Sequence, residues 1–327
     1  MRVGVIGAGA MGQNHIRIYS EMPGVELVGI SDIAVNRVNE LSKRYSTMGF
    51  TDYKDLLKQN LDAVSIVVPT TLHRKVAIDA INANANVLVE KPIADTLENA
   101  RDIVSEAHKA NLTLMVGHIE RFNPAVRKMK EIIDSGELGK VVSISARRVG
   151  PNNPRIRDVG VILDIGVHDI DVISYLYGSN VLEVYAIAGK ELHPHEDHAS
   201  ILLRFNDNNA GVVETNWLTP HKTRNFTVIG TEGVGYGDYM AQTVFIHDKD
   251  WIKEAKIEKK EPLKCELEGF ISACKGRTEP LTTGEDGIHA LEVALAAIMS
   301  YKTNSTIRIS PSIESDACVK KKDSAKT

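Results

Sequence analysis

Three glycines near the start of the chain, Gly7, Gly9 and Gly12, form the pattern GxGxxG between an apolar run and an amphipathic stretch. In that setting the first glycine permits a tight turn, the second lets the backbone approach a pyrophosphate, and the third lets a helix pack closely on a strand. The pyrophosphate then lies on free N–H groups at the positive end of the helix dipole. The alternative is a structural glycine turn that binds nothing, but the order of strand, glycines and helix favours a dinucleotide site.

An acidic residue, Asp32, stands twenty residues after Gly12, at the end of the next apolar run. A carboxylate at this place accepts hydrogen bonds from ribose hydroxyls and repels a 2′-phosphate, so it favours NAD over NADP. Arg37 could instead bind that phosphate, but it comes a helical turn later and the acid is still present. The cofactor that these residues predict is therefore NAD.

Two further groups of residues could carry out acid–base chemistry. Lys91 follows an apolar run in Val89-Glu90-Lys91-Pro92, and ligands of open parallel sheets bind beyond the carboxyl ends of the strands. Asp164 and His168 lie four residues apart, so on a regular helix they share one face, where a carboxylate can fix the tautomer of an imidazole. Taken alone, Lys91 would be a solvated charge and Asp164 a helix cap.

Four arginines, Arg147, Arg148, Arg155 and Arg157, fall within eleven residues of a stretch rich in Pro, Asn and Gly. The planar guanidinium matches phosphate oxygens two at a time. A neutral polyol gives no reason for this much charge, whereas the diphosphate of a nucleotide sugar does. The alternative is a solvated basic loop, or a set of ion pairs with a partner subunit.

The first of two expected domains, residues 1–120, alternates between Val- and Ile-rich runs and amphipathic stretches of helical period. This alternation predicts an α/β fold with a doubly wound parallel sheet, a Rossmann domain that binds NAD. The expected strands are Val3–Ile6, Leu27–Ser31, Ala63–Val68, Asn86–Val89 and Leu112–Val116. The expected helices are Met11–Ser20, Asn36–Tyr45, His73–Asn82 and Leu97–Lys109.

Residues 121–310 are expected to form a second α/β domain, which binds substrate and forms oligomers. Runs of period two joined by turn signals predict an open, largely antiparallel sheet. Its expected strands are Val141–Arg148, Val181–Ala188, Ala199–Phe205, Gly211–Trp217 and Asn225–Gly230, and its expected helices are Ala125–Ser135 and Gly166–Tyr177. A last helix at about residues 285–302 is expected to pack back on the first domain, and residues 311–327 to form a flexible tail.

Composition excludes several classes of protein. The 327 residues include 39 Lys+Arg against 43 Asp+Glu, a formal charge of −4 that disfavours a nucleic-acid binder. Three cysteines without a CxxC pair predict neither a disulfide framework nor a thiolate zinc site, and the tight, Pro-containing His193–His198 run disfavours any other metal site. Because the chain has no charged leader and no apolar run of about 18 residues, we expect a cytoplasmic protein without a membrane contact.

Motifs along nearly the whole chain resemble the glucose–fructose oxidoreductase and inositol dehydrogenase family, with its MocA-like members. They are the glycine loop, residues 69–73, Glu90-Lys91-Pro92, residues 117–124, Asp164-x-Gly166-x-His168-x-x-Asp171, residues 230–233 and Asp286-Gly287. The resemblance implies an NAD(P)-dependent dehydrogenase of sugars or cyclitols, with a Rossmann domain and an α/β domain on an open sheet. It also implies association through that sheet as homodimers or homotetramers.

The same resemblance makes Lys91, Asp164 and His168 a catalytic trio. We expect His168 to take the hydroxyl proton, in a tautomer fixed by Asp164, while Lys91 stabilises alkoxide charge or is itself the base. The expected cofactor-binding residues are Gly7, Gly9, Ala10, Met11, Gly12, Asp32, Pro69, Thr70, Thr71, His73, Glu90 and Lys91. The expected substrate-binding residues are Arg121, Arg148, Arg155, Arg157, Asp164 and His168.

The arginine stretch, with residues 117–124 and 217–225, is most similar to the branch of the family that oxidises carbon 3 of UDP-N-acetylglucosamine. We therefore expect that nucleotide sugar as the substrate and its 3-keto derivative as the product. The alternative is an inositol or other polyol dehydrogenase. The catalytic trio is compatible with that activity, but a polyol substrate gives no reason for the four arginines. A non-catalytic sensor that binds NAD(P) is a third candidate, which the intact trio disfavours.

Overall fold

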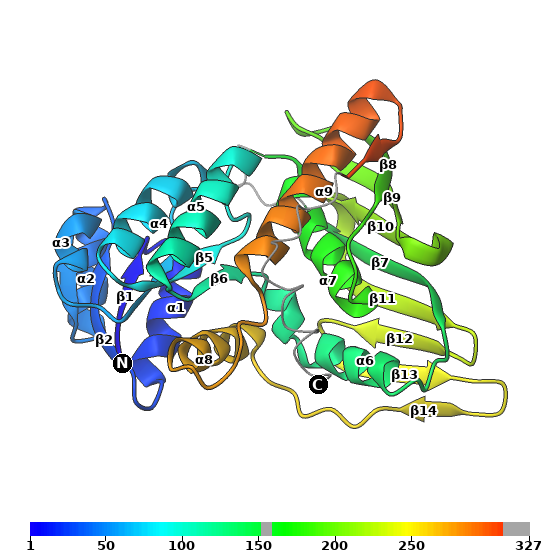
Figure 1. Cartoon of the computed structure of the whole chain (residues 1–327), viewed down its shortest axis with the longest axis horizontal. Coiled ribbons are helices and arrows are strands. Elements are labelled where there is room, and N and C mark those ends of the chain that lie inside the picture. The colour runs from blue at the N-terminus through cyan, green and yellow to red at the C-terminus, as the bar shows by residue number, and fades with distance from the viewer. Residues whose placement is uncertain (152–158, 310–327) are drawn as a thin grey trace, which may run out of the picture.

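A computed structural model describes residues 1–151 and 159–309, which form two sheet-based lobes side by side (Figure 1). The first lobe is built on a six-stranded parallel sheet and the second on a nine-stranded, mostly antiparallel sheet. This α/β architecture confirms the fold class that the sequence predicts. The expected ligands Arg155 and Arg157 and the expected tail lie outside the described residues.

The six-stranded sheet has the order of a doubly wound fold. Its strands are, in spatial order, β3 (Met48–Phe50), β2 (Glu26–Ser31), β1 (Arg2–Ile6), β4 (Ala63–Ile66), β5 (Asn86–Glu90) and β6 (Leu114–Gly117). All five expected strands are present, with ends within two residues of the prediction. The prediction missed β3, because its three residues contain none of the Val and Ile that mark the other strands.

Both faces of this sheet are buried, as the continuous apolar runs require. Val3 and Val5 of β1 belong to one core, and Ile6 of the same strand belongs to the other. The helices of this lobe are α1 (Ala10–Glu21), α2 (Val35–Arg44), α3 (Tyr53–Leu57), α4 (His73–Asn82) and α5 (Leu97–Ala110), with a short 3-10 turn η1 (Thr70–Leu72) before α4. Helices α1 and α2 contribute to the first core, and α3, α4 and α5 contribute to the second.

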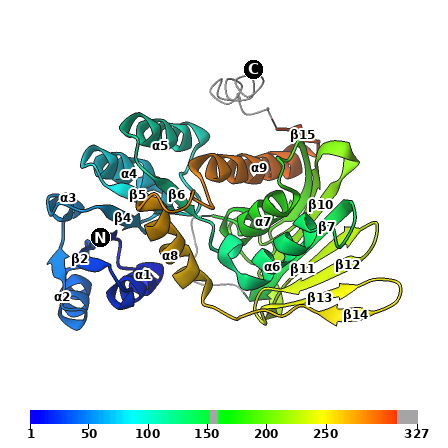
Figure 2. The same ribbon diagram turned by 60° about the horizontal axis from the view of Figure 1, so that its bottom comes forward.

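Two helices from later in the chain also belong to the first lobe. Helix α8 (Pro262–Cys274) packs on α1 and on the 3-10 turn η2 (Ile119–Phe122), with Leu267 and Phe270 fully buried beside β1. Helix α9 (Gly284–Thr303) places Leu291 in the core shared with α5 and Val293 in the core of the second lobe. Figure 2 shows α8 and α9 lying between the two sheets, so they join the lobes.

The nine-stranded sheet pairs β7 with β10 in parallel and all its other neighbours antiparallel. Its spatial order is β14 (Ile252–Glu254), β13 (Thr243–His247), β12 (Val234–Asp238), β11 (Leu218–Gly230), β7 (Val141–Pro151), β10 (Ala210–Asn216), β9 (His198–Arg204), β8 (Glu183–Gly189) and β15 (Ile307–Arg308). The prediction missed β12 to β15 and the first half of β11: glycines interrupt β12, charged residues lie in β14 and the first half of β11, and β13 and β15 are only five and two residues long.

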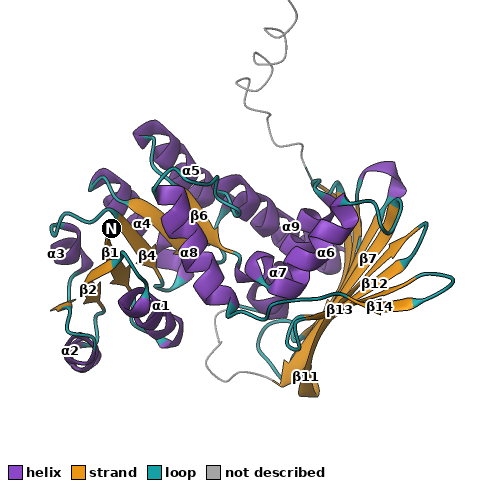
Figure 3. Cartoon of the chain, turned by 90° about the horizontal axis from the view of Figure 1, so that it is seen from below, coloured by secondary structure: helices purple, strands orange, loops and turns teal. Residues whose placement is uncertain are grey.

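Helices α6 (Pro124–Asp134) and α7 (Val167–Tyr177) cover the face of this sheet that points toward the first lobe (Figure 3). In the described part of the chain no helix covers the outer face, which a further 3-10 turn, η4 (Asn206–Asn208), borders. Apolar side chains nevertheless project there, with Ile187 64% exposed and Leu202 51% exposed. An apolar sheet face of this kind is typical of an interaction surface.

The helix expected over Gly166–Tyr177 is present, with α7 starting at Val167. A π-helical turn, η3 (Ile162–Gly166), comes directly before it, which the sequence did not predict. Asp164 therefore lies in the π turn and His168 in the first turn of α7.

Candidate active site

The glycine loop has the geometry that a pyrophosphate needs. Gly7 has a φ of +96°, and a Cβ on Gly12 would lie 1.9 Å from the carbonyl oxygen of Gly7, so both positions require glycine. A Cβ on Gly9 would meet no atom within 4 Å, so the backbone there faces open space. A cavity of about 520 Å³ opens at this point, between Gly9, Ala10 and the side chain of Arg37. The loop thus leaves room for a dinucleotide at the start of α1, whose first turn contains Ala10 and Met11.

The Asp32 carboxylate is tied to this loop. It accepts hydrogen bonds from the backbone N–H of Ala8 at 2.8 Å and of Ala34 at 2.9 Å, and Arg37 lies 3.1 Å from it. Burial opposes ionisation, but these two N–H groups and Arg37 hold the pKa of Asp32 below its ordinary value. Asp32 is therefore an ionised acceptor next to the glycine loop, and its partner Arg37 lines the cavity.

The Pro69–His73 segment is fixed by His73, which is 1% exposed. Its Nδ1 lies 2.9 Å from the carbonyl oxygen of Pro92 and its Nε2 lies 2.9 Å from that of Val68. Burial lowers the pKa of His73. This side chain therefore ties the segment to the end of β5 and does not itself face the cavity, whereas Pro69 and Thr71 are exposed and Thr70 is half-buried.

Glu90, at the end of β5, makes an ion pair with His15 of α1, with His15 Nε2 3.1 Å from Glu90 Oε1. Burial raises the pKa of Glu90, but His15 and Lys91 outweigh it and hold that pKa below its ordinary value. The structure thus places a negative charge directly beneath Lys91.

Lys91 joins the two lobes. Its ammonium donates a hydrogen bond to the backbone carbonyl of Asp164 and lies 3.5 Å from Asp164 Oδ1. The two side chains are only 17% and 15% exposed, so water screens their attraction weakly. Residues that lie 73 positions apart are thereby brought together from β5 and η3.

His168 lies in the first turn of α7, and its pKa is well below the ordinary value. Burial is the largest cause, followed by the positive charges of Lys91 and Arg148. Its Nδ1 is buried, and none of residues 1–151 and 159–309 forms a hydrogen bond with it. In the described residues Asp164 contacts Lys91, and no hydrogen bond links Asp164 to the buried Nδ1 of His168, so the expected fixing of the His168 tautomer by Asp164 is not seen at this nitrogen.

Arg148 and Arg121, expected as substrate ligands, lie inside ion-pair clusters. Arg148 is 2% exposed; its Nε and Nη2 donate to Asp169 at 2.9 and 3.0 Å, its Nη1 donates to Glu120 at 2.8 Å, and it stacks on the ring of Tyr239. Three of its N–H groups are paired with these carboxylates and the side chain is buried, so the structure does not place Arg148 as a free phosphate ligand.

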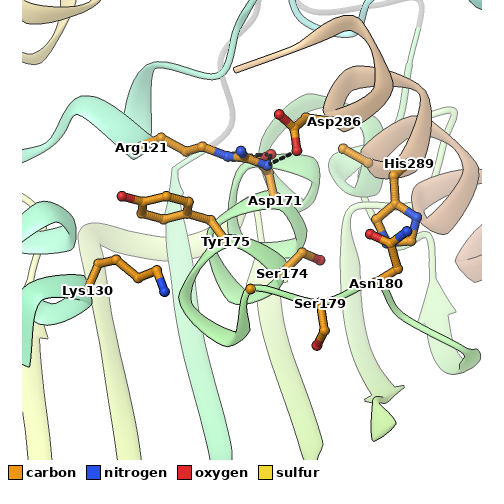
Figure 4. Close-up of a pocket in the computed structure, with 11 residues that line it drawn as sticks. Arg121, Lys130, Asp171, Ser174, Tyr175, Ser179, Asn180, Asp286 and His289 are labelled. Atoms are coloured by element: carbon orange, nitrogen blue, oxygen red, sulfur yellow. Dashed lines mark hydrogen bonds and ion pairs between the residues drawn. The ribbon is translucent and has the colours of Figure 1, made fainter. Parts of the chain in front are cut away.

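Arg121 is 6% exposed and bridges α7 and α9. It donates to Asp171 Oδ1 at 2.7 Å and to Asp286 Oδ1 at 3.0 Å (Figure 4). Removing one partner of such a pair leaves a buried charge uncompensated, so this arginine holds the two lobes together and is not free for a substrate.

Arg224 is a site residue that the sequence analysis did not single out. It lies on β11 opposite Arg148, is half-buried, and its charge lowers the pKa of His168. Within the described ranges no ion pair is formed by its guanidinium, since Arg148 occupies Glu120 and Asp169. Burial and the charge of Arg148 lower the pKa of Arg224 and outweigh the opposing charges of Glu120, Asp169 and Asp164. One arginine in an irregular strand carries no sequence signal that would have revealed it.

The described residues contain no group of three or more His, Cys, Asp or Glu side chains placed to hold a metal ion. Nor does any helix in residues 1–151 or 159–309 have both the length and the apolar character of a bilayer-crossing segment.

Comparison with known proteins defines the class. Residues 1–118 match the family "Oxidoreductase family, NAD-binding Rossmann fold", and residues 126–235 match the GFO/IDH/MocA C-terminal domain. The chain belongs to the GFO/IDH/MocA family, and it is an oxidoreductase with an NAD-binding Rossmann domain. The relatives include dehydrogenases of sugars and polyols.

Three relatives illustrate how similar the chain is to known proteins. The chain is 30% identical over 317 residues to the uncharacterized oxidoreductase YrbE of Bacillus subtilis, covering 91% of this chain and 93% of that protein. It is 28% identical to the myo-inositol 2-dehydrogenase of Thermotoga maritima, with 94% and 98% covered. It is 27% identical to the UDP-N-acetylglucosamine 3-dehydrogenase of Acidithiobacillus ferrooxidans, with 90% and 95% covered. A solved structure of that last enzyme superposes with a TM-score of 0.87, covering 93% of this chain and 98% of that one.

Two glycine variants separate cofactor contact from folding. Gly9→Ala adds a methyl group that no atom opposes, so stability stays within about 0.5 kcal/mol while NAD affinity falls, because the Cβ fills the approach of the pyrophosphate. Gly12→Ala forces a Cβ against the Gly7 carbonyl and destabilises the fold by ~1–3 kcal/mol. Calorimetric titration with NAD and thermal unfolding measure the two effects. A Gly9→Ala protein that binds NAD as tightly as wild type contradicts the assignment.

Proposed function

We propose that this protein oxidises a secondary hydroxyl of a nucleotide sugar with NAD, and that the substrate is UDP-N-acetylglucosamine, oxidised to its 3-keto derivative. The observation that carries the proposal is the contact of Lys91 with Asp164 across the two lobes, beside a neutral His168. An ammonium and an unprotonated imidazole are the two groups that alcohol oxidation needs at one hydroxyl.

In the proposed mechanism the protein handles the proton. His168 takes the hydroxyl proton, and its low pKa keeps it unprotonated at neutral pH. Lys91 donates a hydrogen bond to the same oxygen and stabilises the negative charge that develops there. Asp164 holds the Lys91 ammonium in position; Lys91 as the base is the alternative.

The proposed cofactor contacts follow the glycine loop. Gly7, Gly9 and Gly12, with the first turn of α1, would hold the pyrophosphate, and Asp32 the adenosine ribose. Pro69, Thr70 and Thr71 would line the nicotinamide side, together with Glu90 and Lys91. When bound, the nicotinamide supplies the hydride acceptor.

Arg224 supports an anionic substrate. A half-buried guanidinium without a protein carboxylate, on the same side of the sheet as His168, is an anion site. A diphosphate would supply the missing charge, whereas a neutral polyol would leave Arg224 unpaired. Arg155 and Arg157 remain proposed phosphate ligands.

Two other functions compete. Inositol dehydrogenases are as similar in sequence as the UDP-sugar enzyme, at 28% against 27% identity. A sensor without catalysis would not need the Lys91–Asp164 contact.

The proposed location is the cytoplasm. Its reducing environment is compatible with the free thiols of Cys265 and Cys274 and with NAD-linked chemistry.

The first test offers the wild-type enzyme UDP-N-acetylglucosamine, free N-acetylglucosamine and myo-inositol, and follows NADH by its absorbance. We expect turnover of the UDP-sugar alone. Arg224→Gln should raise KM for the UDP-sugar by about tenfold, the loss of one charge-assisted contact, without changing NAD binding. Arg147→Gln is the matched control, because Arg147 lies on the neighbouring strand with a half-exposed side chain paired to Glu214. Equal KM values for both variants contradict the anion site, and turnover of myo-inositol alone contradicts the proposed substrate.

A second test removes the ammonium. Lys91→Met should lower turnover by ~10²–10⁴-fold with little effect on NAD affinity. Because the charge of Lys91 lowers the pKa of His168, the same variant should raise that pKa, and NMR titration of the imidazole measures the rise. In wild type the acid limb of kcat/KM should lie below the ordinary imidazole pKa. Lys75→Met, at an exposed position on α4, serves as the control. Near-normal turnover of Lys91→Met would refute the assignment.

The apolar outer face of the nine-stranded sheet supports a homodimer or homotetramer. Ile187 and Leu202, with the exposed apolar side chains of β12 and β13 farther across the same sheet, would be buried by a second copy of the chain. Leu202→Glu places a charge on this face and should shift the assembly toward monomer in analytical ultracentrifugation. Sedimentation of wild type as a monomer at micromolar concentration argues against the assembly.

A further inference from the structure

Three buried side chains close to Lys91 lack hydrogen-bond partners. Glu266 of α8 is 0% exposed and His118, which follows β6, is 2% exposed; in the described ranges neither carboxyl oxygen of the first and neither ring nitrogen of the second is hydrogen-bonded. His15 of α1 is 0% exposed, and its Nδ1 is in the same state. Buried polar groups are normally satisfied, so three exceptions in one region require an explanation.

The three side chains come from elements that pack together. Helix α8 contacts both α1 and η2, and His118 directly precedes η2. Burial, with the charges of Glu90, Asp171 and Glu120, raises the pKa of Glu266 well above its ordinary value. Burial also lowers the pKa of His118, where the charges of Asp171 and Asp286 act against those of Arg121 and Lys91. A neutral acid and a neutral imidazole are thus held in one interior region, which polar groups without partners mark as a place for ordered water.

His118 lies between the catalytic groups and a cleft. On one side lies His168: a positive charge on His118 would lower the pKa of His168, and the buried Nδ1 of His168 also lacks a partner among the described residues. On the other side its Nδ1 is 3.9 Å from Asp171 Oδ2, a gap that a small side-chain movement closes. Asp171, Arg121 and Asp286 form the inner wall of an open cleft of about 350 Å³, which Lys130, Tyr175 and His289 border (Figure 4).

We propose that His118, Glu266 and the water they hold form a proton relay that leads from His168 to Asp171 and the cleft of Figure 4. The relay rests on the proposed function. Each turnover moves the carbon-bound hydrogen as hydride, with its electron pair, to NAD, and moves the hydroxyl proton to His168. His168 then releases a proton from Nδ1 to His118, which passes it to Asp171 and to solvent, so the imidazole returns to its neutral form. Glu266 is a positioning residue, whose acidic O–H orients the relay water.

The kinetic test compares Glu266→Gln and His118→Asn with Glu268→Gln, which changes an exposed glutamate on the same helix. Stopped-flow traces record NADH formation and, with an indicator dye, proton release to solvent. In wild type and in Glu268→Gln, NADH formation and proton release should occur at the same rate. In Glu266→Gln and His118→Asn proton release should lag by about tenfold, with unchanged NAD affinity and a larger effect of deuterium oxide. Proton release in step with NADH in both variants overturns the relay.

A second measurement does not depend on turnover. Infrared spectra of the NAD-bound enzyme should contain the carbonyl stretch of a protonated carboxylic acid that shifts in deuterium oxide, is lost in Glu266→Gln and persists in Glu268→Gln. His118→Asn should change the frequency of this carbonyl band. Absence of the band in wild type overturns the relay even where the substrate assignment holds. Its presence with none of the three candidate substrates oxidised supports the neutral acid while the proposed function fails.

Discussion

The contact of the Lys91 ammonium with Asp164 is the interaction on which the site depends, because it is the point where the two lobes share one group of reacting residues. Lys91 is positioned by the end of a parallel strand and Asp164 by a π turn, and neither element can adjust without moving its lobe. The contact can persist only because α8 and α9 return to the first lobe and bury Phe270 and Leu291 in its two cores. A modest electrostatic contact is thus held in place by apolar packing on both sides.

Charges in the interior divide into two kinds. Arg148 and Arg121 have their N–H groups paired with carboxylates, and such pairs define how helices and strands fit together rather than bind a ligand. His168, His118 and Glu266 have buried atoms without hydrogen-bond partners in the described part of the chain, where Arg224 forms no ion pair. An unpaired buried group is costly, so these are the places where a substrate anion, water or a proton can complete the hydrogen bonding.

Much of the fold could be predicted, and the errors have physical causes. The Val- and Ile-rich strands of the first lobe were found because both faces of a parallel sheet are buried, which gives an unmistakable apolar run. Strands β12 to β15 were missed, since they are short, and glycines in β12 and charges in β14 weaken the period of two on a half-solvated sheet. Helix α8 was expected as part of the second domain, because its position in the chain gives no sign that Leu267 packs beside β1.

The sequence by itself determined the glycine loop, Asp32 and the identity of the reacting groups, because these depend on residue type and on short spacings within one element. The tertiary structure decided which of these groups meet. Asp164 contacts Lys91 of the other lobe, and in the described residues it makes no hydrogen bond to the buried Nδ1 of His168. The tertiary structure also decided the partners of each arginine. Arg148 forms ion pairs with two carboxylates, whereas Arg224 forms none in the described residues. Burial and ion pairing depend on packing between distant segments, which no local sequence pattern encodes.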